Sequence, residues 1–551
     1  MAGYHGWSTW EFDEERDFKA SKLWIWDKKE SYAVMTLLDM WVCMDGYAIT
    51  AFQYGAERLS IPTTKGVDYR TKDGWLYIAV IMPSEEERKK REPIFRERIA
   101  PWIDDYSKEW GKFTDELMGY YEQFKAVDVE KLEDIELRQH LRDWIPVYRK
   151  NGICHFIAMY AQATIMVLFE DMCQELLGID RHDPVYNRLM AGFDNRVFQT
   201  ARGLWQLAGR VSELGLEQLF HTIQDDEQLL SELEESEAGK KWLQELREFL
   251  WSDGWRTEAN WFISIPSWVE KPALALPSVR QALGMGGVFV LEQARARLTK
   301  EREEAEKETL SRIPEERREW FAKLMRSTQL STSCNEGHQF YCENYGTGIW
   351  RRITKEIGRR FALAGIIDDP QDVYWLLPEE IDMRMIPKLD ARKWVQIRKE
   401  QHQEFRKTEP PLFIGDPSLV PVQLVADPFL TTRIIAEPRV KPELKADLYG
   451  AASAPGVVEG TARFITSESE FSQVQPGEIL VTVETSPIWT PLFGIVNGVV
   501  TDVGGAVSHA IIVGREFGLP VVAGTHEGSK KIRTGMRIRV DGDMCAVYIL
   551  E

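Results

Sequence analysis

Apolar side chains recur at every third or fourth position from about residue 84 to residue 250, separated by charged ones. This spacing places the apolar residues on one face of an α-helix, which is typical of helices packed on a core. The pattern returns over residues 335–365, where Gly365 is positioned to end the helix. We therefore predict a large, mostly helical region, interrupted over residues 251–290 by a structured loop rich in turn and aromatic residues.

A short strand pattern precedes the helices. The run WLYIAVIMP, residues 75–83, predicts a strand that ends at Pro83. The Asp-Gly turn just before it favours a hairpin. We expect a small β element near residues 60–83.

The C-terminal hundred residues have a different pattern. Residues 448–551 alternate short apolar runs with turn residues and predict a compact α/β unit, with a helix over 508–517 between two strands. Asp541-Gly542 predicts a hairpin turn within the last strand region. The expected strands are residues 477–484, 498–502, 520–524 and 536–550.

A proline-rich stretch separates the two regions. Residues 408–429 hold five prolines, which remove backbone donors and break regular structure. We therefore predict a multidomain α+β chain. Its expected parts are a mainly helical domain at 1–407, a linker or hinge at 408–447 and an α/β domain at 448–551.

Charge and cysteine content narrow the function classes. The net charge of −19 argues against nucleic-acid binding, which uses basic surfaces. The six cysteines are scattered and form no CxxC, which fits a reducing cytoplasm. The N-terminus lacks the pattern of a signal peptide, and the apolar stretch 156–169 is too short to span a bilayer. We expect a cytoplasmic protein with no membrane partner.

Tryptophan is unusually frequent, with 20 residues. These side chains have two interpretations. They are either large core aromatics or the lining of a site for an aromatic ligand.

One stretch carries candidate chemistry: TDVGGAVSHAIIVGREFGLPVVAG, residues 501–524. Gly504 and Gly505 allow a tight turn, after which Ser508 and His509 begin the expected helix. The free N–H groups and the dipole at a helix N-terminus attract an anion. A neutral imidazole there can accept a phosphoryl group as a nucleophile. A structural, helix-capping histidine is the alternative, and the residue types alone do not separate the two.

The C-terminal region resembles the phosphohistidine domain of the phosphoenolpyruvate (PEP)-utilising enzymes. The resemblance runs through ASAPGVVEGTARF (452–464), PGEILVTVETSPIWTPLF (476–493), the stretch above and the closing hairpin. It implies a swivelling mobile domain in which His509 is phosphorylated at a ring nitrogen. The positions that fall on the family pattern are Gly504, Gly505, Ser508, His509 and Arg515. Val507 stands where the family usually has threonine, which argues against regulation by phosphorylation of that hydroxyl.

The helical part is similar to the substrate-binding domain of rifampicin phosphotransferase and of the large subunit of phenylphosphate synthase. GWRTEANWFISIPSWVEKP (254–272) and DVYWLLPEEI (372–381) carry this resemblance. Relatives also have an ATP-grasp domain, and no segment here is identified as one. We therefore expect ATP and Mg²⁺ to act on a separate ATP-grasp subunit, in a hetero-oligomer.

These resemblances imply a phosphotransferase that passes a phosphoryl group from His509 to a phenol-type hydroxyl, as in aromatic degradation. A phosphotransferase acting on another alcohol or an antibiotic fits the same motifs. A non-catalytic phosphocarrier is a third alternative.

The acceptor site needs cations near the phosphate and a base for the hydroxyl proton. Arg351 and Lys355 are spaced i, i+4 and share a helix face, with Arg352 adjacent. Surface salt bridges are the alternative for these cations. His338 is a candidate base, although a structural histidine is the alternative.

Two further groupings complete the candidates. Arg256 and Glu258 lie in the loop motif and form another candidate pair for the acceptor site. Cys334, His338 and Cys342 share helical spacing, but they lack a fourth ligand or a CxxC clamp. We therefore assign no metal site from the sequence.

Overall fold

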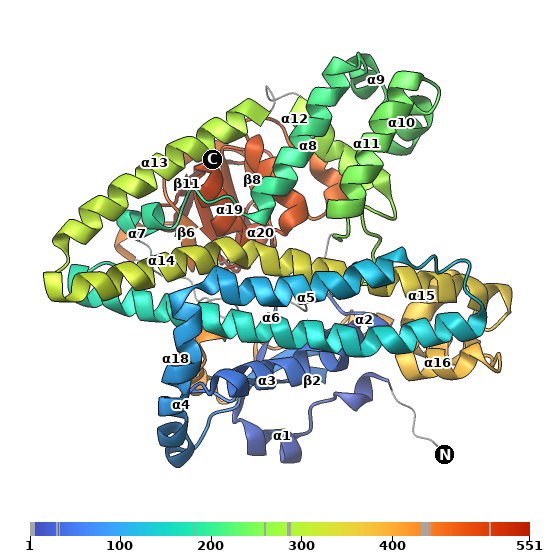
Figure 1. The fold of residues 1–551 in the computed structure, drawn as a ribbon, viewed down its shortest axis with the longest axis horizontal. Helices are drawn as coiled ribbons and strands as arrows, with labels where there is room; N and C mark the ends of the chain where they lie inside the picture. The colour runs from blue at the N-terminus through green and yellow to red at the C-terminus, as the bar shows by residue number, and fades with distance from the viewer. Residues whose placement is uncertain are drawn as a thin grey trace. The chain divides into compact units, whose positions relative to one another are not determined.

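A computed structural model gives the structure of the chain. It describes residues 6–28, 31, 33–181, 183–257, 261–283, 288–430, 440, 442–505 and 508–550. The chain forms two compact units (Figure 1). Unit 1 consists of Met1–Thr164, Ala259–Pro266 and His338–Thr431, and unit 2 consists of Ile165–Glu258, Ser267–Gly337 and Thr432–Glu551. This division does not follow the predicted borders at 407 and 448, and the linker over 408–447 stays a prediction.

Unit 1 is mainly helical, as expected. Its α-helices are α1 (Glu14–Ala20), α2 (Leu37–Cys43), α3 (Ile49–Leu59), α4 (Glu85–Asp104), α5 (Tyr106–Ala126), α15 (Tyr345–Leu363), α16 (Pro378–Met385), α17 (Arg392–Phe405) and α18 (Val420–Ala426). Two π-helical turns, η2 (Met44–Ala48) and η4 (Gln339–Asn344), interrupt this helical structure. Residues Pro370–Trp375 form the 3₁₀ helix η5. As predicted, α15 ends before Gly365, whose φ of 67° a glycine adopts without strain.

A four-stranded sheet joins the helices of unit 1, in the order β2-β3-β1-β4. Strands β2 (Val67–Lys72) and β3 (Trp75–Val80) form the predicted hairpin. Strand β1 (Leu23–Trp26) pairs antiparallel with β3 and with β4 (Phe413–Gly415). The proline-rich stretch therefore contributes an edge strand to this sheet.

Unit 2 contains a second helical part. Its helices are α7 (Pro184–Leu189), α8 (Arg196–Glu213), α9 (Glu217–Thr222), α10 (Asp226–Leu233), α11 (Glu237–Asp253), α12 (Leu276–Leu283), α13 (Val288–Arg312) and α14 (Glu315–His338). Helices α8 and α11 lie side by side (Figure 1). The short 3₁₀ helix η3 (Pro272–Ala275) leads into α12.

The C-terminal α/β part of unit 2 is built as predicted. Its eight-stranded sheet has the order β5-β12-β11-β7-β8-β9-β10-β6, and β7 to β10 run parallel. Helix α19 (His509–Phe517) leads into β10, and α20 (Gly528–Lys531) follows that strand. The strands are β5 (Leu448–Tyr449), β6 (Ala452–Ala454), β7 (Val457–Phe464), β8 (Ile479–Thr482), β9 (Gly498–Thr501), β10 (Val521–Ala523), β11 (Arg537–Asp541) and β12 (Ala546–Ile549).

One apolar cluster holds unit 2 together. It includes Phe198 of α8, Val279 of α12 and Ile511 of α19. Burial of each such side chain contributes about 1.5–3 kcal/mol to stability. The α/β part and the helical part of unit 2 therefore share one core.

The longest helix is α6 (Asp134–Leu177). By length and hydropathy alone it is apolar enough to cross a membrane, yet 83% of its most apolar window is buried inside the protein. This burial is typical of a core helix.

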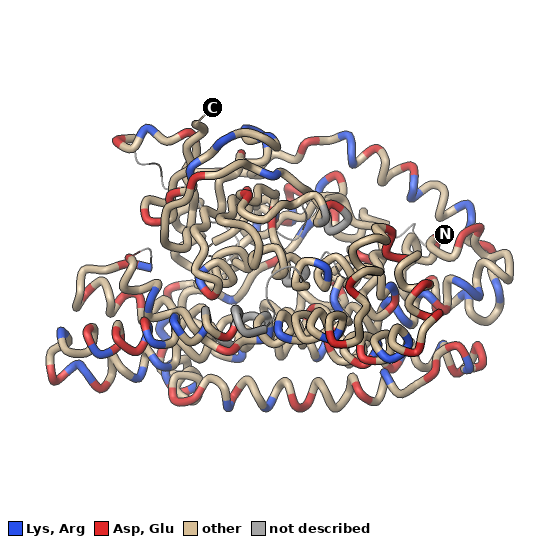
Figure 2. Tube along the Cα trace, turned by 90° about the horizontal axis from the view of Figure 1, so that it is seen from above, with Lys and Arg blue, Asp and Glu red and all other residues tan. Residues whose placement is uncertain are grey.

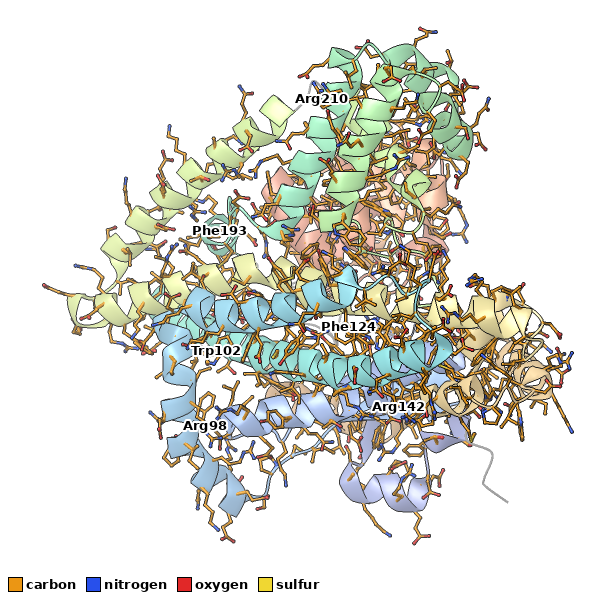
Figure 3. All side chains as sticks on the ribbon, turned by 45° about the vertical axis from the view of Figure 1, so that its right-hand side comes forward. Arg98, Trp102, Phe124, Arg142, Phe193 and Arg210 are labelled. Carbon is orange, nitrogen blue, oxygen red and sulfur yellow. The ribbon has the colours of Figure 1, made fainter. Side chains whose placement is uncertain are left out.

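Charged residues of both signs intermix along the helices (Figure 2). Arg142 of α6, labelled in Figure 3, shows the usual arrangement: with Arg138 it donates to the carboxylate of Asp382 at 2.7–3.0 Å. Such exposed pairs contribute little to stability, about 0–1 kcal/mol each.

Candidate functional site

His509 is the first residue of helix α19. Ser508 is the N-cap residue, but its hydroxyl oxygen is buried without a hydrogen-bond partner among the described residues. Gly504 has a φ of 140°, and a Cβ there would lie 2.8 Å from the Ser508 Oγ. Only glycine therefore fits before this helix start. Gly505 accepts the backbone N–H of Ser508 through its carbonyl.

Two threonine hydroxyls hold the imidazole of His509. Nδ1 lies 2.9 Å from the Oγ1 of Thr485, and Nε2 lies 3.2 Å from the Oγ1 of Thr490. Thr490 is part of the 3₁₀ helix η10 (Pro487–Gly494), whose Phe493 meets the ring edge-on at 5.7 Å. A neutral imidazole has one N–H donor and one acceptor nitrogen, so one hydroxyl accepts and the other donates.

Burial keeps this histidine neutral. Burial, together with the positive charge of Arg256, lowers the pKa of His509 from 6.5 to about 3. A neutral ring retains a lone pair on one nitrogen, which is the form that can attack phosphorus.

Arg256 is the cation that acts on His509. It is 3% exposed and donates from Nε to the carbonyl of Asp253 at 3.0 Å and from Nη2 to the Oγ1 of Thr200 at 2.9 Å. Its guanidinium lies over the ring of Trp268, 5.5 Å from the centroid. The sequence suggested Arg256 for the acceptor site, paired with Glu258. The structure associates Arg256 with His509, and Glu258 lies outside the described residues.

The depressed pKa of His509 predicts a pH-dependent stability. The imidazole binds a proton below about pH 6.5 in the unfolded state but only near pH 3 in the folded state. The contribution of His509 to the free energy of unfolding is therefore fully present above pH 6.5 and is lost as the pH falls from there toward 3. Between pH 7 and pH 5 the wild type should lose about 2 kcal/mol relative to His509→Gln. Urea unfolding of both proteins at the two pH values measures this difference. Equal losses would show that His509 titrates normally in the folded chain.

Arg515 and Glu516 lie at the other end of α19. Both are buried, which lowers the pKa of Arg515 to about 10 and raises that of Glu516 to about 8. Glu516 accepts the N–H of Gly192 at 3.0 Å, and Arg302 lies over the ring of Phe193, labelled in Figure 3. Arg515 is thus placed in a buried charge network, nearly two helical turns from His509.

Three of the acceptor-site candidates lie on α15 of unit 1 and differ in exposure. Arg351 is 3% exposed and donates from Nη1 to the carbonyl of Ile263 at 2.8 Å and to the hydroxyl of Tyr374 at 3.0 Å. Arg352 is half-buried and donates to the carbonyl of Lys125 at 2.8 Å. Lys355 is exposed. Of the two cations spaced i, i+4, Arg351 is therefore buried and Lys355 is exposed.

A buried carboxylate holds the part of the loop motif (residues 254–272) that belongs to unit 1. Asp39 accepts the N–H of Ser264 at 3.0 Å, the Ser264 hydroxyl at 2.6 Å and the Thr36 hydroxyl at 2.7 Å. Burial raises the pKa of Asp39 to about 6, opposed by these bonds and by the charge of Arg351. Asp39 and Arg351 together fix Ile263 and Ser264. The sequence pattern alone gave no signal for Asp39.

His338 is buried and groups with residues that the sequence did not connect to it. It lies beside His155 and Glu343 in unit 1, and these three form the one group of potential metal ligands among the described residues. Cys334 and Cys342, which share helical spacing with His338, are not part of this group.

Thr485 and Thr490 are the site residues that sequence reasoning missed. Both lie in the segment that resembles the family's strand-and-turn region, so the resemblance contained a signal for them. The tryptophans favour the core interpretation: Trp24, Trp144, Trp242, Trp255, Trp268 and Trp350 are among the largest fully buried side chains.

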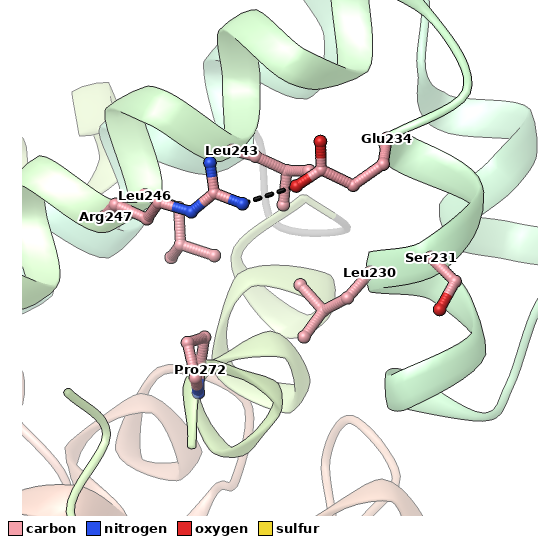
Figure 4. Close-up of a pocket in the computed structure, with 7 residues that line it drawn as sticks. All are labelled: Leu230, Ser231, Glu234, Leu243, Leu246, Arg247 and Pro272. Atoms are coloured by element: carbon pink, nitrogen blue, oxygen red, sulfur yellow. Dashed lines mark hydrogen bonds and ion pairs between the residues drawn. The ribbon is translucent and has the colours of Figure 1, made fainter. Parts of the chain in front are cut away.

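A small pocket lies between α10, α11 and η3 of unit 2 (Figure 4). Leu230, Leu243 and Leu246 line it, and an ion pair between Glu234 and Arg247 borders it. The pocket includes none of the predicted site residues.

Comparisons with known proteins agree with this architecture. The family described as "PEP-utilising enzyme, mobile domain" matches residues 474–544, which contain His509 and both threonines. The "Rifampicin phosphotransferase fourth domain" matches residues 155–336. PEP-utilising enzymes work through a phosphohistidine intermediate.

Curated relatives include phosphotransferases and a phosphoenolpyruvate synthase. The chain is 28% identical to "Uncharacterized phosphotransferase YvkC" of Bacillus subtilis over 72% of this chain and 47% of the relative. It is 27% identical to rifampicin phosphotransferase of Bacillus subtilis over 58% of this chain and 36% of the relative. Over 19% of this chain and 13% of the relative it is 43% identical to phosphoenolpyruvate synthase of Pyrococcus furiosus.

The chain spans about half or less of the length of these relatives. The matches nevertheless cover both parts of unit 2 and agree with the helical and α/β architecture seen there. The chain therefore contains a region similar to the mobile domain of PEP-utilising enzymes and a helical region similar to the fourth domain of rifampicin phosphotransferase.

Proposed function

We propose that this chain is a phosphotransferase component that carries a phosphoryl group on His509 and transfers it to a hydroxyl acceptor. The observation that carries this proposal is a neutral, buried imidazole at the N-terminus of α19, with its two nitrogens against Thr485 and Thr490. It lies within a matched mobile domain of the PEP-utilising type.

In the first half-reaction, the lone pair of a His509 ring nitrogen attacks the phosphorus of the donor. A nitrogen–phosphorus bond forms and the bond to the donor's leaving oxygen breaks. Since each nitrogen faces a threonine hydroxyl, the phosphoryl group takes the place of one of these contacts. The proton on the other nitrogen stays on that nitrogen and is donated in a hydrogen bond to the threonine hydroxyl that faces it.

The charges around His509 suit this step. The N-terminus of α19 and the guanidinium of Arg256 both place positive charge toward the developing phosphoryl group. The Ser508 hydroxyl is available as a further donor to its oxygens. Phosphoryl transfer depends mainly on such positioning and charge stabilisation.

The donor in this proposal is ATP, bound with Mg²⁺ on a separate ATP-grasp subunit. The resemblance to phenylphosphate synthase, whose ATP-grasp part is a separate subunit, supports the arrangement. Mg²⁺ neutralises the phosphate charges during the transfer.

In the second half-reaction, a phenol-type hydroxyl attacks phosphorus, the nitrogen–phosphorus bond breaks and the hydroxyl proton passes to a base. We assign the acceptor to unit 1, with Arg351, Arg352 and Lys355 as candidate cations and His338 as candidate base. The similarity to rifampicin phosphotransferase makes an antibiotic hydroxyl the second candidate acceptor. A bare phosphocarrier is disfavoured because a carrier needs only the mobile domain.

Labelling with γ-phosphate-labelled ATP tests the proposal in two stages. With an ATP-grasp protein present, the chain should take up one acid-labile, base-stable phosphoryl group, as a phosphohistidine does. The isolated phosphorylated chain should then lose its label to phenol, with phenyl phosphate as the product. Stable labelling that no phenol or antibiotic alcohol discharges would instead favour the phosphocarrier.

A further inference from the structure

Two histidines and a glutamate meet inside unit 1, apart from the mobile domain. His155 lies on α6, His338 is the last residue of α14 and Glu343 lies in the π-turn η4. All three side chains are 3% exposed. The Nε2 atoms of His338 and His155 lie 3.6 Å and 4.0 Å from the Glu343 Oε1.

A π-turn brings Glu343 beside His338. In an α-helix, residues five apart point about 140° away from each other, because each residue turns the chain by about 100°. The wider π-turn, closed by i to i+5 hydrogen bonds, returns the fifth residue to nearly the same face. The turn η4 begins immediately after His338 and contains Glu343. Such π-turns occur frequently at functional sites.

A second π-turn supports the same cluster. Tyr47 of η2 places its hydroxyl 2.9 Å from the Nδ1 of His155 and 3.5 Å from the Oδ1 of Asn151. The side-chain amide of Asn151 donates to the carbonyl of Cys342 in η4 at 2.6 Å. When the Tyr47 hydroxyl donates to Asn151 and accepts from Nδ1–H, the lone pair of His155 is on Nε2. That nitrogen is the one that faces Glu343.

With the proton of His155 on Nδ1, two acceptor groups face each other in this cluster. Besides the Nε2 of His155, it contains the carboxylate of Glu343, whose Oε2 is buried without a hydrogen-bond partner among the described residues. A buried carboxylate oxygen without a partner is costly, which indicates that a cation belongs here.

We propose that His155, His338 and Glu343 bind a divalent transition-metal ion. Their ligand atoms all lie within 4.8 Å of one another. A metal bonded at about 2.0–2.2 Å to imidazole nitrogen and carboxylate oxygen holds its ligand atoms about 3–4 Å apart. The widest pair therefore has to close by about 1 Å when the ion binds.

The ion also sets the orientation of the rings. The two imidazoles lie 4.7 Å apart at an interplanar angle of 18°. The lone pair of each nitrogen lies in the plane of its ring, so two nearly parallel rings do not point at a common position. To bind the same ion, His338 rotates about its side-chain torsions, while the hydrogen bond to Tyr47 holds His155 in place.

The ligand set selects the metal. Two imidazoles and one carboxylate suit Zn²⁺, Fe²⁺ or Co²⁺, whereas Mg²⁺ prefers oxygen ligands and retains several waters. Three protein ligands leave a coordination position for water or another oxygen. This proposal does not depend on the phosphohistidine chemistry, but a His338 bound to the ion cannot also act as the base for the acceptor hydroxyl.

Titration of the metal-free full-length chain with Zn²⁺, and separately with Co²⁺, tests the site. We expect one equivalent to bind, and Glu343→Gln and His155→Asn to weaken binding at least tenfold each. His140→Asn, on the same helix and outside the cluster, should bind as the wild type does. Mg²⁺ in millimolar excess should not compete.

Three results would overturn the site. They are an absence of stoichiometric Zn²⁺ binding by the wild type, binding that Glu343→Gln leaves unchanged, and a thiolate charge-transfer band with Co²⁺, which would mean cysteine ligands. Because Glu343→Gln keeps the volume of the side chain, a circular dichroism spectrum matching the wild type separates lost binding from lost folding.

Discussion

His509→Ala is expected to abolish phosphorylation of the chain, with a loss of more than about 10⁴-fold in the labelling rate. The reason is that the substitution removes the nucleophile itself, and the neighbouring hydroxyls of Thr485 and Thr490 are not activated by any other base described at this site. Intact-mass spectrometry after incubation with ATP and an ATP-grasp protein measures the result directly. The wild type should gain one phosphoryl group and the variant none.

His526→Asn is the matched control for this change. His526 lies in the same α/β part and has a φ of 63°, a conformation that asparagine tolerates. The His526→Asn variant should be phosphorylated on His509 at the wild-type rate. Label that persists in His509→Ala would identify another residue as the carrier and reject the proposed role of His509. Since both half-reactions use His509, transfer to any acceptor should disappear as well.

Arg256→Met should slow phosphorylation of His509 by about 10²–10³-fold, the usual cost of losing one charge-stabilising group in an active site. Methionine keeps much of the length of the side chain but removes the buried positive charge. Without that charge the pKa of His509 should also rise, although burial, the larger cause of its depression, remains. Single-turnover labelling measures the rate, and NMR titration of the imidazole measures the direction of the pKa change.

Arg196→Met is a suitable comparison. Arg196 also lies in unit 2 and donates to Asp253 at 2.8 Å, but it is not among the charges that act on the pKa of His509. If the labelling rate falls by the same factor in both variants, the cause is a general loss of packing in this part of unit 2. Wild-type labelling by Arg256→Met would exclude a role for its charge in the first half-reaction.

Much of the fold follows from local pattern. The helix over 508–517, the strands around it and the hairpin that ends in β3 were predicted because their periodicity and turn residues are local properties of the chain. Other features required distant contacts. Strand β4 is formed by antiparallel pairing with β1. A sequence pattern cannot identify a partner nearly four hundred residues away.

The sequence by itself determined the identity of the histidine and its position: a Gly-Gly turn, then Ser508 and His509 at a helix start. The tertiary structure decided what surrounds that ring. Thr485 and Thr490 come from 24 and 19 residues away, and Arg256 comes from the helical part of unit 2. The neutral state of His509 depends on burial by these segments, because desolvation is a property of the packed environment and not of the residue. Packing also explains why the sequence did not connect His338 with His155 and Glu343, which lie on α6 and in the π-turn η4.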